Sequence, residues 1–142
     1  MIVWFTGQPG SGKTTLAKAL NPEYLVDGDD LRLLDNPGYD ELGRRRNIDR
    51  AQAIAAYCWN RGGLVAVSLV SPYRDQREDF KARFPVVEIY LHTSEIRGKE
   101  NYFVDDYQPP LTNHIAINTG GMSVDEAIRI IHRTLAAAPP RP

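Results

Sequence analysis

Cysteine is scarce in this chain, whose 142 residues include only Cys58. A single thiol can form neither an internal disulfide nor a cysteine metal cluster, so a reducing compartment is indicated and we expect a cytoplasmic protein. A surplus of one charge is also lacking, since 17 basic residues face 18 acidic ones for a formal net charge of -1. That balance argues against a global pull toward nucleic acid or membranes, without excluding a local basic patch that binds nucleic acid.

Long apolar runs are absent as well. None is long enough to span a bilayer, and the first residues suit a buried strand better than a signal peptide. The length predicts one domain with its own core, which we place at residues 1–137. Small residues and prolines at 138–142 predict a flexible C-terminal tail.

The most informative stretch that is present is GQPGSGKT, at residues 7–14. It lies between an apolar run at 2–5 and a helical pattern at 16–20, which is the strand, loop and helix order of a phosphate-binding loop. Such a loop turns backbone N–H groups toward phosphates at a helix N-terminus, and the alternative is a chance match in a glycine-rich turn. Lys13 is expected to reach the terminal phosphates of ATP, and Thr14 to hold Mg²⁺. The predicted nucleotide-binding residues here are Gly7, Gly10, Ser11, Gly12, Lys13, Thr14 and Thr15.

Apolar runs rich in β-branched residues predict five strands, at 2–5, 24–26, 64–70, 86–91 and 114–117. Helical patterns lie between most of them, which predicts an α/β fold of the P-loop NTPase type, a parallel five-stranded sheet with helices on both faces. A capping box at Ser123 and an apolar stripe that begins at Val124 mark the last helix. Segments 27–47 and 92–113 lack this regularity, and both follow strands, so we expect them at the ligand-binding edge of the sheet.

Polar residues in the first irregular segment suit chemistry. Asp27 and Asp29 follow the second strand, where a carboxylate can orient Mg²⁺ or take a proton from an attacking hydroxyl, although a solvated Asp-Gly turn is the alternative. Arg44 and Asn47 continue the inward stripe of the next helix. Because burying an unpaired guanidinium or amide is costly, we expect both to point into the ligand cleft, while Arg50 lies at the flank of the stripe.

Three further positions have structural alternatives of equal weight. Ser71 ends the third strand and could bond a ligand, and Arg74 or Arg77 could pair with an anion. The alternative is a Ser-Pro helix start with surface charges. Tyr39 and Tyr102 lie in the irregular segments, where a ring could clamp a base by stacking or merely pack within a loop. The histidines have no metal-ligand spacing.

Taken together, these stretches resemble the adenylylsulfate kinase family, whose members phosphorylate the 3′-hydroxyl of adenosine 5′-phosphosulfate (APS) with ATP. The resemblance covers most of the chain, and its motifs occur in the same order. They are the phosphate loop at 7–14, Asp-Gly-Asp and an arginine at 27–32, an aromatic and basic motif at 39–50, Ser-Pro-Tyr-Arg at 71–74, an Asn-Phe-like pair at 101–102, and the last strand and helix around 118–124.

The resemblance implies roles for individual residues. Tyr39 and Tyr102 would sandwich the substrate adenine, and Ser71 would line the same pocket. The ribose and phosphosulfate would be held by Arg32, Arg44, Asn47 and Arg50. ATP and Mg²⁺ are the implied cofactors, with Thr14 and Asp27 at the metal and Thr119 at the nucleotide. Either Asp27 or Asp29 would assist the attacking hydroxyl as the catalytic carboxylate. Asp29 would also belong to the substrate site.

The chain departs from the family pattern between the fourth strand and the Asn-Phe-like pair. Family members carry a basic lid there, and only residues 92–100 occupy that interval here. Arg97 and Lys99 are the cations in it that could replace some of the lid's charge. A missing lid predicts slower transfer, more ATP hydrolysis or a bulkier acceptor. Two other functions therefore stay open: a kinase that acts on another nucleotide, a small metabolite or a nucleic-acid end, and a nucleotide-binding module with little turnover. Family members often pair, which leaves a homodimer open.

Overall fold

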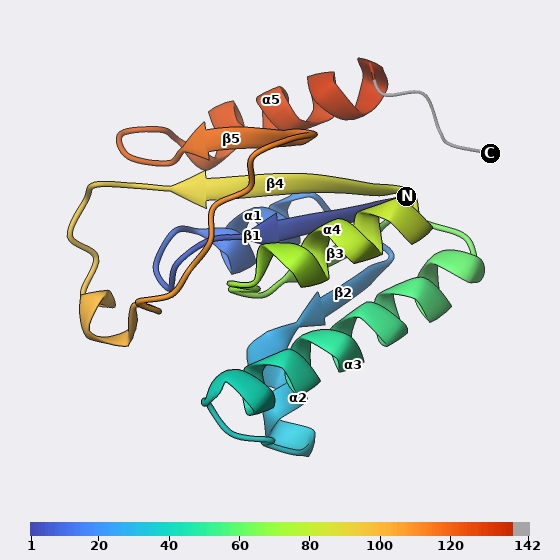
Figure 1. Cartoon of the computed structure of the whole chain (residues 1–142). Helices are drawn as coiled ribbons and strands as arrows, with labels where there is room; N and C mark the ends of the chain where they lie inside the picture. Colours follow the sequence, from blue (N-terminus) through green and yellow to red (C-terminus); the bar gives the residue numbers. More distant parts are fainter. Residues whose placement is uncertain (138–142) are drawn as a thin grey trace.

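The computed structural model describes residues 1–137, and the predicted tail at 138–142 lies outside them. The strands form one parallel sheet in the order β2-β3-β1-β4-β5 (Figure 1). They are β1 (Ile2–Thr6), β2 (Tyr24–Asp27), β3 (Val65–Ser68), β4 (Val86–His92) and β5 (His114–Asn118). The helices are α1 (Lys13–Ala19), α2 (Gly28–Leu34), α3 (Glu41–Asn60), α4 (Arg74–Arg83), η1 (Glu100–Tyr102, a 3-10 turn) and α5 (Val124–Ala137).

Helices cover both faces of the sheet. The central strand β1 is accordingly buried on each side. Its residues Ile2 and Trp4 belong to an apolar cluster with residues of α3 and α4. Val3 and Phe5 point the other way, as alternation along a strand requires, into a second cluster with residues of α1 and α5. The predicted α/β fold of the P-loop NTPase type is confirmed.

The carboxyl ends of the five strands lie at one edge of the sheet, since all strands are parallel (Figure 1). The phosphate loop follows β1, Asp27 ends β2, and Ser68 ends β3. Open parallel sheets bind ligands outside this edge. Segments far apart in the sequence are thereby brought to one place.

Several local predictions were wrong. Residues 27–47 are not a long loop, because Asp27 caps α2 by accepting a hydrogen bond from the Asp29 N–H at 2.8 Å. The third strand ends at Ser68 rather than at residue 70, since the chain turns at Ser71 with φ 50°. Val124 is 40% exposed and not part of the core. Ser123 does cap α5, accepting from the Glu126 N–H at 3.1 Å.

Within residues 1–137, none of the helices combines the length and the apolar character needed to cross a membrane.

Candidate active site

The phosphate loop has the backbone that its glycines allow. Gly7, Gly10 and Gly12 have positive φ values of 154°, 83° and 103°, and α1 begins directly afterwards at Lys13. A Cβ on Gly7 would collide with the Leu91 carbonyl of the neighbouring strand, so this position requires glycine. The Ser11 hydroxyl is buried and has no hydrogen-bond partner in the described part of the chain. A loop of this shape suits a bound anion.

The ammonium group of Lys13 lies inside the loop. Lys13 is 9% exposed, and its Nζ donates to the Gln8 carbonyl at 2.9 Å. Burial lowers the pKa of Lys13 from the ordinary 10.5 to about 8, against the opposing attraction of Asp29 and Asp27. Burial thus disfavours the charged form of Lys13, and a bound anion would favour it.

Three oxygen atoms meet beside the loop in a way that suits Mg²⁺. The Thr14 Oγ1 lies 3.1 Å from the Asp27 Oδ2 and 2.9 Å from the Ser68 Oγ. Residues 1–137 contain no group of three or more histidine, cysteine or acidic side chains that could hold a metal by themselves. Mg²⁺ in kinases is usually held by one or two protein oxygens together with water and phosphate, so this donor set fits it.

The two carboxylates are placed differently. Asp27 is engaged through both oxygens, with Oδ1 bound by the Asp29 N–H and Oδ2 by the Thr14 hydroxyl. The Asp29 carboxylate accepts no hydrogen bond from residues 1–137, and Asp29 lines the cavity described next. Asp27 is therefore oriented toward the possible metal position, and Asp29 is available to a ligand.

A cavity of about 630 Å³ extends from the phosphate loop along the edge of the sheet. Ten of the predicted site residues line it: Gly10, Lys13, Asp27, Asp29, Arg32, Tyr39, Arg44, Asn47, Ser71 and Tyr102. The cations Lys13, Arg32, Arg44 and Lys99 outnumber the two acids. This excess of positive charge suits a polyanionic ligand.

The rings at the two predicted base-stacking positions are accessible, with Tyr39 62% and Tyr102 71% exposed. The Arg32 guanidinium lies over the Tyr39 ring, 4.0 Å from its centroid, and donates to the Gly38 carbonyl at 2.7 Å. Arg44 approaches Asp106 at 3.8 Å. Both arginines are thus partly fixed within the cavity, and a direct contact with substrate stays a prediction for each.

Arg50 lies behind the cavity lining rather than in it. Its Nη2 donates to the Asn47 Oδ1 at 2.6 Å and to the carbonyls of Leu31 at 3.0 Å and Asp35 at 2.8 Å. The Asn47 amide in turn donates to the Gly28 carbonyl at 3.4 Å. In this geometry Arg50 orients Asn47 and joins α2 to α3, so its predicted substrate contact is not shown.

Ser71 lines the cavity, and the protein already uses its hydroxyl. The Trp4 indole donates to the Ser71 Oγ at 2.8 Å, and that hydroxyl donates to the Leu69 carbonyl at 3.0 Å. Arg74 and Arg77, weighed as anion partners, bind carbonyls instead: Arg74 that of Pro109 at 2.9 Å, and Arg77 that of Ser71. Both arginines thereby contact the chain rather than a free site.

The cavity is also lined by Ser68 and Phe103, which the sequence did not single out, and by Lys99 and Asn101, which the sequence named without placing them in the cavity. Ser68 ends a strand at the ligand edge, a signal that could have identified it. The other three lie in an irregular segment that has no periodicity to orient a side chain. Their position follows only from where the chain crosses the phosphate loop.

Residues 93–99, which we call the strap, connect β4 to η1 and lie against the phosphate loop. The Arg97 guanidinium donates to the carbonyls of Gly10 and Thr119, both at 3.0 Å. The Thr119 hydroxyl donates to the Ser11 carbonyl at 2.8 Å. Thr119, which was predicted to bind the nucleotide, is therefore hydrogen-bonded both to the phosphate loop and to the strap.

A phosphate-binding loop whose lysine, hydroxyl and carboxylates border a cationic cavity at the edge of a parallel sheet defines a P-loop kinase that uses ATP. The chain belongs to the adenylylsulphate kinase family, whose sequence profile matches residues 1–102.

Individual relatives agree with this family. The adenylyl-sulfate kinase of Burkholderia ambifaria is 31% identical over 165 residues, covering 94% of this chain and 91% of the relative. The APS kinase CysC of Mycobacterium tuberculosis in complex with AMPPNP and APS has a TM-score of 0.82 at 23% identity, covering 95% of this chain and 96% of that one, and shows the fold alone. A hexameric APS kinase from Thiobacillus denitrificans has a TM-score of 0.76 at 30% identity, over 96% of this chain and 28% of that chain.

The alignment with the Burkholderia ambifaria kinase spans 165 positions, more than the 142 residues of this chain. The relative therefore carries residues for which this chain has no counterpart. The short strap after β4 is consistent with the predicted loss of most of the lid.

Proposed function

We propose that this chain transfers the γ-phosphoryl group of ATP to the 3′-hydroxyl of APS and so forms 3′-phosphoadenosine 5′-phosphosulfate. Family membership supports the reaction. The single observation that carries the proposal is the continuous cavity, which is lined both by Lys13 and by Arg32, Tyr39 and Tyr102. One space can thus hold a polyphosphate tail and a second nucleotide.

The donor phosphates would bind the backbone N–H groups of the loop and the Lys13 ammonium. Thr14 and Asp27 would hold Mg²⁺, which supplies charge neutralisation for the transferring group. The Lys13 ammonium would stabilise the negative charge that develops on the phosphoryl oxygens in the transition state. Positioning and charge stabilisation, without a covalent intermediate, account for the catalysis.

The acceptor nucleotide would lie between Tyr39 and Tyr102, with its anionic group near Arg32 and Arg44. Its 3′-oxygen forms the new bond to the γ-phosphorus, while the bond from that phosphorus to the bridging oxygen of ADP breaks. The hydroxyl proton goes to the Asp29 carboxylate, which no protein donor occupies within residues 1–137. Asp29 is thus the base and Asp27 the metal ligand.

An acceptor-dependent ADP assay tests the function. Purified protein with ATP and Mg²⁺ is expected to release ADP much faster when APS is added, with a matching amount of the 3′-phosphorylated product. A panel of other nucleotides, small hydroxyl metabolites and nucleic-acid ends serves as the comparison. No rate increase with APS would refute the sulfate role, and faster transfer to another member of the panel would identify a kinase with that acceptor.

The shortened strap supplies a cation of its own. Arg97 is held by carbonyls, and Lys99 lines the cavity, where its Cβ would lie 3.1 Å from a Cβ placed on Gly10. We infer that Lys99 approaches the donor phosphates in place of the missing lid cations.

Replacing Lys99 by alanine is expected to lower kcat/KM for ATP about tenfold, equivalent to about 1.4 kcal/mol of transition-state stabilisation. The measurement is steady-state kinetics at saturating acceptor. Lys18→Ala, at an exposed position of α1, is the matched control and is expected to leave the value unchanged. Equal effects of the two substitutions would contradict the inferred contact.

Three other properties also stay predictions: the assembly, the domain bounds and the location. A homodimer is the proposed assembly, which the molecular mass in solution would test, and the hexameric relative makes a larger assembly the alternative outcome. One kinase domain over residues 1–137 and a cytoplasmic location are the remaining expectations, which limited proteolysis and cell fractionation would check.

A further inference from the structure

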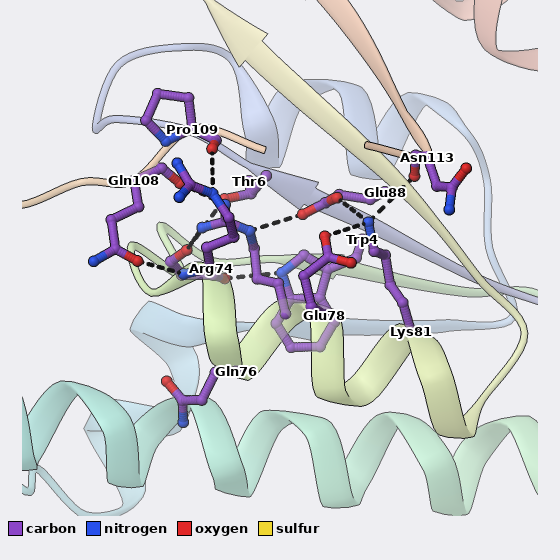
Figure 2. Close-up of polar contacts among 12 residues, drawn as sticks. Trp4, Thr6, Arg74, Gln76, Glu78, Lys81, Glu88, Gln108, Pro109 and Asn113 are labelled. Atoms are coloured by element: carbon purple, nitrogen blue, oxygen red, sulfur yellow. Dashed lines mark hydrogen bonds and ion pairs between the residues drawn. The ribbon is translucent and has the colours of Figure 1, made fainter. Parts of the chain in front are cut away.

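A buried ion-pair network joins β4 to α4, among residues that the proposed reaction does not use (Figure 2). Glu88 of β4 is 1% exposed. Its Oε2 accepts from the Arg77 Nε at 2.7 Å, and its Oε1 accepts from the Lys81 Nζ at 2.7 Å. One carboxylate therefore receives two cations from α4.

Arg77 continues from this network to the cavity wall. Its Nη1 donates to the Ser71 carbonyl and its Nη2 to the Gln108 carbonyl. The Gln108 N–H donates back to the Pro72 carbonyl at 2.8 Å. Because Ser71 and Pro72 both line the cavity, one guanidinium fastens the wall after β3 to the chain that approaches β5.

The turn that Arg77 holds has an uncommon backbone. Ser71 has φ 50°, a left-handed conformation that few residues other than glycine adopt. It is 1% exposed, and its hydroxyl is fixed by Trp4 and Leu69. Such a conformation persists where the surroundings determine it, and it occurs often at functional sites.

The network is poorly explained as a device for stability alone. A buried ion pair often contributes little compared with apolar side chains of the same size, because both charges lose their hydration. The planar guanidinium, however, donates along three fixed directions, to Glu88, Ser71 and Gln108. A lysine ammonium cannot reproduce that planar fork.

We propose that Arg77 is a positioning residue, which sets the cavity wall at Ser71 and Pro72 and thereby the fit of the acceptor nucleotide. The inference rests on the proposed function, because it assigns this wall to the acceptor. In the described residues Arg77 makes no hydrogen bond to the phosphate loop at 7–14. The turn is linked to the start of that loop through the Thr6 hydroxyl, which donates to the Val70 carbonyl at 2.7 Å and the Ser71 carbonyl at 3.4 Å. We therefore expect a much smaller effect on ATP binding than on acceptor binding.

Arg77→Lys tests this role, because it keeps the charge beside Glu88 and removes the fork. The KM for APS is expected to rise about tenfold while the KM for ATP changes less than twofold. Lys81→Met removes the other cation beside Glu88, together with its bonds to the carbonyls of Thr112 and Asn113, which do not line the cavity. It is expected to lower Tm with both KM values kept. Arg129→Lys, at an exposed position of α5, is the control.

An equal rise of the two KM values in Arg77→Lys, or the same acceptor effect in Lys81→Met, would overturn the proposal in favour of general destabilisation. A second measurement needs no turnover. Trp4 donates to Ser71, so its indole N–H resonance reports the turn, and Trp59 is the only other tryptophan. Arg77→Lys is expected to shift the Trp4 signal. If APS proves not to be the acceptor but that signal shifts, the proposed function fails and the positioning of the turn stands; an unshifted signal refutes the positioning.

Discussion

Replacing Lys13 by methionine is expected to lower kcat by about a thousandfold, the largest effect of any single substitution in the site. The side chain keeps a similar length, so the loop retains its packing, but the transferring phosphoryl group loses its buried cation. Steady-state kinetics with saturating ATP and APS measure the loss. Lys18→Met, an exposed lysine of the same helix, is the control. A decrease of less than tenfold in Lys13→Met would remove this lysine from the chemistry.

The pH dependence gives an independent test of the same group. Because the pKa of free Lys13 is lowered to about 8, kcat/KM for ATP, which reports the free enzyme, is expected to fall as the pH rises through about 8. Lys13→Met should lack this decline.

The sign is opposite for stability. Between about pH 8 and pH 10.5 the unfolded chain binds more protons at Lys13 than the folded chain does, so the contribution of this lysine to the free energy of unfolding rises with pH.

The two carboxylates are expected to separate into two roles, each with a loss of about a hundredfold in kcat. Asp27→Asn retains an oxygen to cap α2 but loses the charge beside Thr14, so its half-saturating Mg²⁺ concentration should rise. Asp29→Asn should lose activity with an unchanged Mg²⁺ requirement. The measurement is kcat as a function of Mg²⁺ concentration for both variants.

Asp30→Asn, at an exposed neighbouring acid that does not line the cavity, is the control for this pair. A raised Mg²⁺ requirement in Asp29→Asn alone would exchange the two roles. Full activity in both variants would point instead to a nucleotide-binding module.

The strands and the phosphate loop could be predicted because their signals are local. Apolar runs mark β1 and β4, and a glycine loop between a strand and a helix has few alternatives. The order of the strands depends on packing between distant segments, which no local pattern shows. Helix α2 was missed because only Leu31 among its large apolar residues is buried, while Leu33 and Leu34 are 85% and 81% exposed.

The candidate site was predictable where a motif fixed both residue type and spacing, as with Lys13, Asp27 and Arg44. In the strap the sequence identified Arg97 and Lys99 as cations, but it could not show that Arg97 binds the Gly10 carbonyl while Lys99 lines the cavity. The position of Glu88 in the sequence could have indicated the buried ion pairs. A lone acid within the apolar run of β4 requires a buried partner, which the structure supplies as Arg77 and Lys81.

The fastening of Arg97 to carbonyls of Gly10 and Thr119 has a consequence for the time course of turnover. A mobile lid must open before the product nucleotide dissociates, and this opening is often the rate-limiting step. Here the strap is short and Arg97 ties it to the phosphate loop, so we expect ADP to leave without such a movement. The first turnover should then be no faster than those that follow, and rapid mixing should reveal no initial burst of ADP.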